Sequence, residues 1–107
     1  MNLENFLISL NNTPDKIDFN GVIALIDSLY TFKPRQFTNG PIVNEAGQNS
    51  GSCKLFAFAA LQKFDKTQTL HCFGDYYRQD VLAHSDGNDH QNIRAFLANR
   101  NGLEEVH

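Results

Sequence analysis

The chain has 107 residues, of which 41% are hydrophobic and 20% charged, and its formal net charge is −3. This length suits one domain over residues 1–107, with enough chain to bury a hydrophobic core without disulfide or metal cross-links. Charges of both signs are mixed without a basic stripe, and no apolar run approaches the ~20 residues of a membrane helix, so we expect neither nucleic acid nor membrane as a partner.

Cysteine usage indicates a reducing compartment. The two cysteines, Cys53 and Cys72, are too few for a disulfide framework and lack zinc-finger spacing, and the N-terminus has no signal-peptide pattern. We therefore expect a cytoplasmic protein with reduced thiols, and the sequence indicates no cofactor.

The first third of the chain predicts two amphipathic helices. Leu3, Phe6, Leu7 and Leu10 follow the helical spacing i, i+3, i+4, i+7, and a proline at position 14 closes the pattern. Asp18 is typical of an N-cap, with Ile17 and Val22 spaced as a hydrophobic staple for a helix through residue 30.

A long neutral loop over residues 38–54 precedes the most apolar segment of the chain. Ser50 or Ser52 is the expected cap of a helix over about 53–64, whose run LFAFAAL leaves almost no polar face. Such a helix belongs in the centre of the fold.

The second half predicts three more helices. Asp65 and Gln68 have capping-box spacing for a helix that ends at Gly74. Asp75 is the expected N-cap of a helix with the sequence YYRQDVLAH, and Asn88 or Asp89 is the expected N-cap of the last helix. Period-two alternation is nowhere sustained, so no sheet is expected. The prediction is an all-α, compact orthogonal bundle of about five to six short helices with one long ordered loop.

The loop and the helix after it are the first candidate ligand site. Glycines let backbone N–H groups face outward, and a helix N-terminus attracts anions. The candidate ligand-binding residues here are Asn39, Asn44, Gln48, Asn49, Ser52 and Lys54. The alternative is that these side chains satisfy the backbone of the loop itself.

Cysteine and histidine residues are the candidates for catalysis or metal binding. Cys53 in a first helical turn could be a nucleophile with His71 or His90 as its base, although burial against the apolar helix is the structural alternative. His84, Asp86, Asp89 and His90 could bind a divalent metal across the turn, although their spacing matches no standard motif and Asn88 or Asp89 is also the expected helix cap.

Tyrosine and arginine side chains form a second candidate ligand site. Arg78 and Arg94 could clamp a carboxylate or phosphate beside Tyr77. The alternative is that the arginines form ion pairs, Arg78 with Asp75 or Asp80, and Arg94 with Asp89 or Asp27.

Several segments together resemble the HopJ family, which is named for a type III effector of plant pathogens. The segments are FTNG (37–40), NEAGQNSGSCKLFAF (44–58), QTLHCFGDYYRQDVLAH (68–84) and DHQNIRAF (89–96). The resemblance implies no established catalytic residue, and it raises secretion into a host cell as the alternative to a cytoplasmic location. Ser85 in place of a proline and the tail NRNGLEEVH depart from the family pattern.

Together these features predict a binding or interaction module, with a polar site formed by the 38–54 loop and the 76–94 region. Its partner would be a protein or a small anionic ligand. The alternative is a Cys/His-dependent or metal-assisted hydrolase or transferase.

Overall fold

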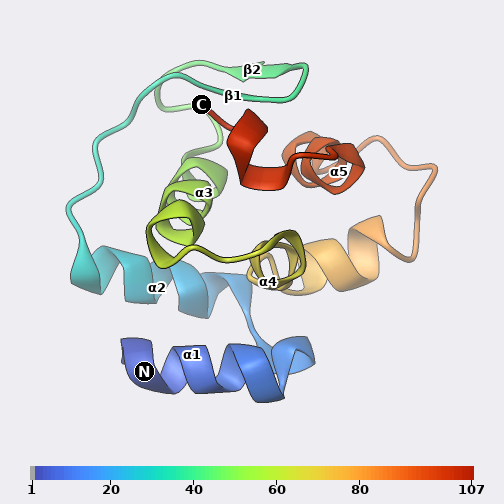
Figure 1. The fold of residues 1–107 in the computed structure, drawn as a ribbon. Coiled ribbons are helices and arrows are strands. Elements are labelled where there is room, and N and C mark those ends of the chain that lie inside the picture. The colour runs from blue at the N-terminus through green and yellow to red at the C-terminus, as the bar shows by residue number, and fades with distance from the viewer. Residues whose placement is uncertain (1) are drawn as a thin grey trace.

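The computed structural model describes residues 2–107, which form a mainly helical protein (Figure 1). Its α-helices and strands are α1 (Leu3–Asn12), α2 (Phe19–Leu29), β1 (Phe37–Asn39), β2 (Ile42–Asn44), α3 (Ser50–Gln62), α4 (Lys66–His71) and α5 (Gln91–Ala98). Short 3₁₀ segments occupy Pro14–Lys16 and Gly102–Glu105, and a π-helix occupies Tyr76–Val81. None of the helices in residues 2–107 has the length and apolar character needed to cross a membrane.

Two of the predicted helix starts are confirmed. The Asp18 carboxylate accepts the backbone N–H of Gly21 at 3.0 Å, which caps α2. Asp65 and Gln68 form the reciprocal capping box of α4, with bonds of 2.7 and 2.9 Å. These caps supply acceptors for N–H groups that have no intrahelical partner, so the local sequence alone sets where each helix begins.

Helix α3 lies in the centre of the fold, as its apolar sequence predicts (Figure 1). Its Phe56 ring is 5.0 Å from Phe96 of α5 and 5.5 Å from Phe73, measured between ring centroids. Phe58 on the same helix contacts Phe6 of α1 at 6.0 Å. Burial of these rings joins α1, α5 and the turn after α4 to one core around α3, where each large side chain contributes roughly 1.5–3 kcal/mol.

The expectation of no sheet is wrong, because β1 and β2 form an antiparallel hairpin within the long loop. Each strand has only three residues, and the buried positions are Phe37, Asn39 and Asn44, of which the two asparagines are 0% and 1% exposed. A strand this short with buried amides shows no hydrophobic alternation. The available signal was Gly40, which has φ of 56° at the first position of the two-residue loop Gly40–Pro41, where tight hairpin turns favour glycine.

The C-terminal tail pairs with the hairpin. Thr38 and His107 exchange two backbone hydrogen bonds of 2.8 and 2.9 Å, and Asn39 forms a bridge with Val106. The chain end therefore covers the edge of β1, which would otherwise present unpaired backbone groups.

The predicted helix after Asp75 is a π-helix, and Asp75 is not its cap. Asp75 has helical backbone angles and makes no capping bond. The Leu82 N–H bonds the Tyr77 carbonyl at 2.9 Å, five residues back, and the helix ends at Val81 rather than continuing to His84. The wider turn changes the direction of the side chains that follow, including Asp80.

Candidate functional site

A pocket of about 490 Å³ lies where the N-terminal ends of α3 and α5 meet; we call it the α3–α5 pocket. Its lining combines aromatic and apolar side chains with polar groups from the two helix starts. The lining residues are Phe19, Ile42, Asn49, Gly51, Ser52, Phe73, Tyr76, His90, Gln91, Asn92 and Ile93. The two segments named in the sequence, the 38–54 loop and the 76–94 region, both contribute to it.

The start of α3 has no side-chain cap. Asn49 precedes the helix in the left-handed conformation, with φ of 50°, and the predicted caps are wrong. Ser50 is already helical and its hydroxyl donates to the Gly47 carbonyl at 3.2 Å, while Ser52 lies in the first turn. The first-turn N–H groups have no intrahelical acceptor, and Gly51 and Ser52 line the pocket.

The start of α5 repeats this arrangement. His90 precedes the helix with φ of 48° and provides no side-chain cap. The predicted caps, Asn88 and Asp89, are wrong because the Asp89 carboxylate instead binds Arg94 at 2.5 Å. Gln91 and Asn92, in the first turn, line the same pocket. Two uncapped helix N-termini thus share one hollow.

Four asparagines hold the hairpin to both helix starts; we call Asn39, Asn44, Asn49 and Asn92 the amide cluster. The Asn92 side-chain oxygen accepts from Asn39 at 3.1 Å and from Asn44 at 3.0 Å. The Asn44 oxygen accepts from Asn92 at 3.0 Å and from Asn49 at 2.7 Å. Asn39 and Asn44, proposed from the sequence as ligand-binding residues, therefore use their buried amides on the fold and are not in the pocket lining.

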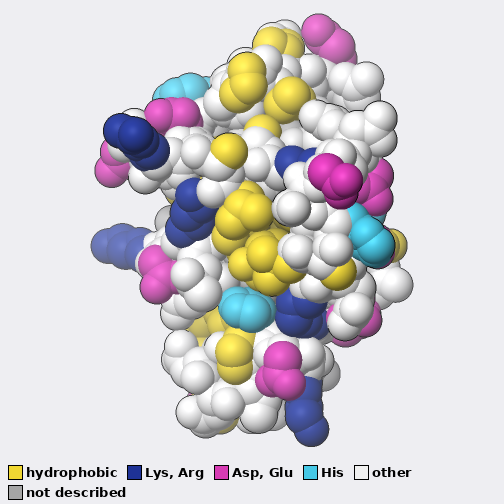
Figure 2. All heavy atoms as spheres, turned by 90° about the vertical axis from the view of Figure 1, so that its right-hand side faces the viewer, with side chains coloured by type: hydrophobic (Ala, Val, Ile, Leu, Met, Phe, Trp, Pro, Cys, Tyr) yellow, Lys and Arg dark blue, Asp and Glu magenta, His cyan; other side chains and the backbone are white. Residues whose placement is uncertain are grey.

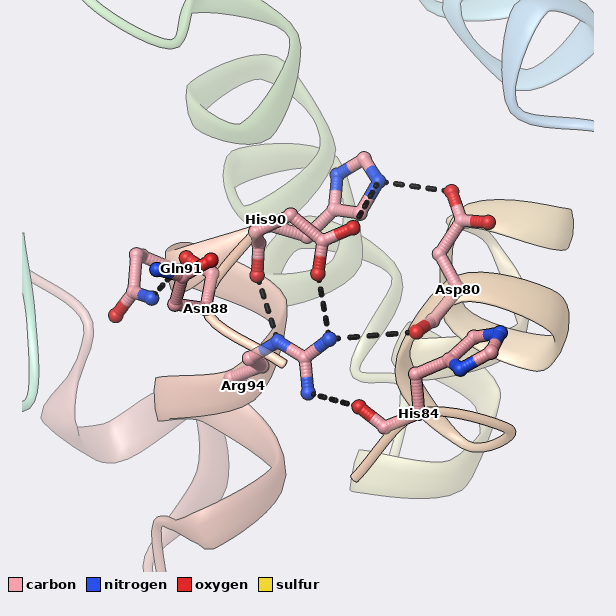
Figure 3. Close-up of polar contacts among 7 residues, drawn as sticks. Asp80, His84, Asn88, His90, Gln91 and Arg94 are labelled. Atoms are coloured by element: carbon pink, nitrogen blue, oxygen red, sulfur yellow. Dashed lines mark hydrogen bonds and ion pairs between the residues drawn. The ribbon is translucent and has the colours of Figure 1, made fainter. Parts of the chain in front are cut away.

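His90 connects the pocket to two carboxylates on its other side (Figure 3). Its Nε2 lies 2.9 Å from Asp80 Oδ2 and 3.9 Å from Asp89 Oδ2. An ionised carboxylate only accepts hydrogen bonds, so the geometry assigns the Nε2 hydrogen to the Asp80 contact. The ring also packs on Tyr76, with 4.9 Å between centroids.

Arg94 closes the turn beneath His90. Its guanidinium donates to the backbone carbonyls of Asp89, His84 and Asp80 at 2.6, 2.8 and 3.3 Å, and to the Asp89 carboxylate (Figure 3). The predicted Arg94–Asp89 pair is confirmed, and the hydrogen bond lowers the pKa of Asp89. With these bonds made, Arg94 is a structural clamp and is absent from the pocket lining.

Arg78 is a second clamp. It donates to the backbone carbonyls of Ile17, Pro14 and His71 at 2.5, 3.0 and 3.3 Å, and it pairs with Asp75 at 3.6 Å, one of the two partners expected. The adjacent Tyr77 is buried, with its ring 5.6 Å from that of His71. Burial, and then the Arg78 charge, lower the pKa of His71.

The remaining loop candidates face elsewhere. Lys54 binds Asp27 at 2.8 Å and lies 5.3 Å from the centre of the Phe32 ring. Gln48 is exposed, and its side-chain oxygen accepts the Glu45 N–H at 3.0 Å. Neither lines the α3–α5 pocket.

Cys53 is buried, with 4% of its surface exposed. It lines two other hollows, and the described residues around those hollows include no histidine. His71 lies against Arg78 and His90 against Asp80. The structure thus places the three catalytic candidates in three different surroundings.

The metal candidates are only partly assembled. His84 and Asp86 are exposed, and His84 contributes its backbone carbonyl to Arg94. Within residues 2–107, one group of ligand atoms converges: those of Asp80, Asp89 and His90 lie within 4.8 Å of one another. From the sequence, Asp80 was expected only as a candidate ion-pair partner of Arg78, because the π-helix and the turn that bring it toward His90, ten residues away, are not evident in the sequence.

The face that carries the 84–90 turn has an apolar centre bordered by charged side chains (Figure 2). Acidic, basic and histidine side chains alternate around that centre, and no continuous basic field covers this face (Figure 2).

Comparison with known proteins identifies a family but no activity. No curated protein matches the chain. A crystal structure described as that of a protein of unknown function, VPA0580, is 48% identical, with a TM-score of 0.93 over 100% of this chain and 88% of that chain. A family model described as HopJ type III effector protein matches residues 3–107, which confirms the resemblance seen in the motifs. The chain therefore belongs to the HopJ type III effector protein family.

Proposed function

We propose that the chain is a binding module for a small ligand that joins an anionic group to an aromatic or apolar body. The observation that carries this proposal is the convergence of two uncapped helix N-termini on one pocket of about 490 Å³. Each N-terminus presents free N–H groups and about half a positive charge, and both favour an anion.

The aromatic walls of the pocket would bind the aromatic or apolar body of such a ligand. Phe19, Phe73 and Tyr76 line it, with the Phe19 and Phe73 rings stacked 5.9 Å apart. Gly51 lets this aromatic wall approach α3, since a β-carbon there would lie 2.9 Å from the Phe19 ring. Its volume falls in the range of roughly 300–1,000 Å³ that is usual for small-molecule sites.

The proposal is tested with a matched set of probes: phenyl phosphate, inorganic phosphate and the neutral benzyl alcohol. Binding is followed by NMR through the backbone amides of Gly51, Ser52, Gln91 and Asn92. Phenyl phosphate should bind most tightly, because it alone engages both the helix N-termini and the aromatic wall. Equal binding of benzyl alcohol, or shifts confined to other amides, would contradict the proposal.

Ser52→Asp provides the decisive variant. A carboxylate in the first turn of α3 is favourable for the helix, yet it places a negative charge in the pocket. Phenyl phosphate affinity should fall at least tenfold, or about 1.4 kcal/mol, while the melting temperature is retained. Ser52→Asn is the uncharged control and should bind nearly as the wild type does. Unchanged affinity in Ser52→Asp would refute an anion at this position.

We propose the bacterial cytoplasm as the place of action, with delivery into a host cell as the alternative. Both cysteines are free and buried, which is typical of a reducing compartment. Because both cytosols are reducing, the thiols do not separate these locations. A translocation assay on a tagged chain does: export that depends on a type III system would overturn the resident location.

A further inference from the structure

We propose that Asp80, Asp89 and His90 form a binding site for a divalent transition-metal ion of the zinc and manganese class. One imidazole nitrogen and two carboxylate oxygens lie within 4.8 Å of one another. Metal–ligand bonds of about 2.0–2.2 Å place neighbouring ligand atoms roughly 3–4 Å apart. The observed separations from His90 Nε2, 2.9 Å to Asp80 and 3.9 Å to Asp89, are of that size, and the metal ion would replace the hydrogen that Nε2 donates to Asp80.

The ligand types favour this class of metal. Imidazole suits zinc and its transition-metal neighbours, and carboxylates are hard oxygen ligands that these ions also accept. The two carboxylates and the one guanidinium of Arg94 leave a net negative charge at the cluster, which favours a cation. Three protein ligands leave coordination positions open, as in reactive rather than purely structural sites.

The surroundings hold the ligands in place. Arg94 binds Asp89 through Oδ1, so that Oδ2 remains for a metal, and it fixes the backbone carbonyls of both aspartates. Such outer contacts orient ligating carboxylates in metal sites. Gly87 makes the clamp possible, because a β-carbon at this position would lie 2.6 Å from the Arg94 Nη2 atom.

The metal site and the α3–α5 pocket share only His90. Asp80 and Asp89 are not among the pocket-lining residues, and Ser52 is not part of the cluster. Variants of the two aspartates therefore test metal binding without changing the pocket lining, and the outcome is separable from that of the ligand tests above.

The test uses the full chain after removal of adventitious metal by a chelator. Zn²⁺ and Mn²⁺ are titrated separately by calorimetry near neutral pH, and Mn²⁺ is also added in an NMR experiment. One ion should bind per chain, and Mn²⁺ should broaden the ring signals of His90 more than those of His84.

Asp80→Asn should weaken metal binding at least about tenfold, because it removes one of the three ligands. The controls are Asp86→Asn and His84→Gln, which alter exposed side chains of the same turn that lie outside the cluster. Thermal melting verifies that each variant is folded. The proposal is overturned if the wild type binds neither ion, or if the control variants lose as much affinity as Asp80→Asn.

Discussion

Replacement of Asn92 by alanine should release the hairpin from the start of α5. The Asn92 side chain makes three hydrogen bonds of 3.0–3.1 Å, all within the amide cluster. Its loss leaves the buried Asn44 amide without its acceptor, whereas Asn39 keeps the Asn92 backbone carbonyl at 2.7 Å and the Asn44 oxygen keeps Asn49.

The expected loss of stability follows from these partners. One orphaned buried donor costs roughly 1–3 kcal/mol, and the two bonds whose partners are otherwise satisfied add roughly 0.5–1 kcal/mol each. The free energy of unfolding should therefore fall by about 3 kcal/mol. For a chain of this length, about 3 kcal/mol corresponds to a decrease of roughly 13 °C in the melting temperature.

Urea unfolding monitored by circular dichroism measures this difference. Asn88→Ala is the matched control, because Asn88 is exposed in the neighbouring turn and its side chain takes no part in the cluster. The control should change the free energy of unfolding by less than about 0.5 kcal/mol. A loss below about 1 kcal/mol in Asn92→Ala would show that the amide cluster does not hold the two helix starts together.

Two further predictions concern buried positions. Burial raises the pKa of the Cys72 thiol from 9.0 to about 12. The folded state therefore keeps this proton longer than the unfolded state does, and the stabilising contribution is complete below pH 9 and lost as the pH rises toward about 12. Urea unfolding between pH 9 and about 12 should show that the free energy of unfolding falls more steeply with pH for the wild type than for Cys72→Ala. Parallel pH dependences for the two proteins would contradict this prediction. Gly74→Ala should destabilise the fold more than Gly40→Ala does, although both glycines have positive φ, of 64° and 56°. A β-carbon at Gly74 would lie 2.8 Å from the Phe19 backbone nitrogen, whereas Gly40 has no atom within 4 Å. We expect the free energy of unfolding to fall by more than about 3 kcal/mol in Gly74→Ala and by about 1 kcal/mol in Gly40→Ala. Equal decreases in the two variants would refute the steric argument.

The sequence indicated which segments of the chain would contribute to the pocket, but not which side chains. The loop start of α3 and the segment around His90 were both named as polar surfaces, and both line the pocket. Individual roles within these segments were predicted only in part, as in the pairs of Arg94 with Asp89 and of Arg78 with Asp75. Lys54 is bound by Asp27, Arg78 binds backbone carbonyls about 60 residues away, and Arg94 binds carbonyls of the preceding turn, so side chains that look available in the sequence are occupied in the fold.

The sequence by itself determined where most helices form and which of them is central. Helical spacing, the Asp18 cap, the capping box at Asp65 and the apolar run of α3 depend on interactions within a few residues, so they can be read without the fold. The family was also evident from motifs in order. Only the tertiary structure decided that the loop amides turn inward to join the hairpin to α5 while two helix N-termini open to a shared pocket. The physical reason is that a buried amide must find its partner wherever the fold supplies one, here 48 residues away in Asn92.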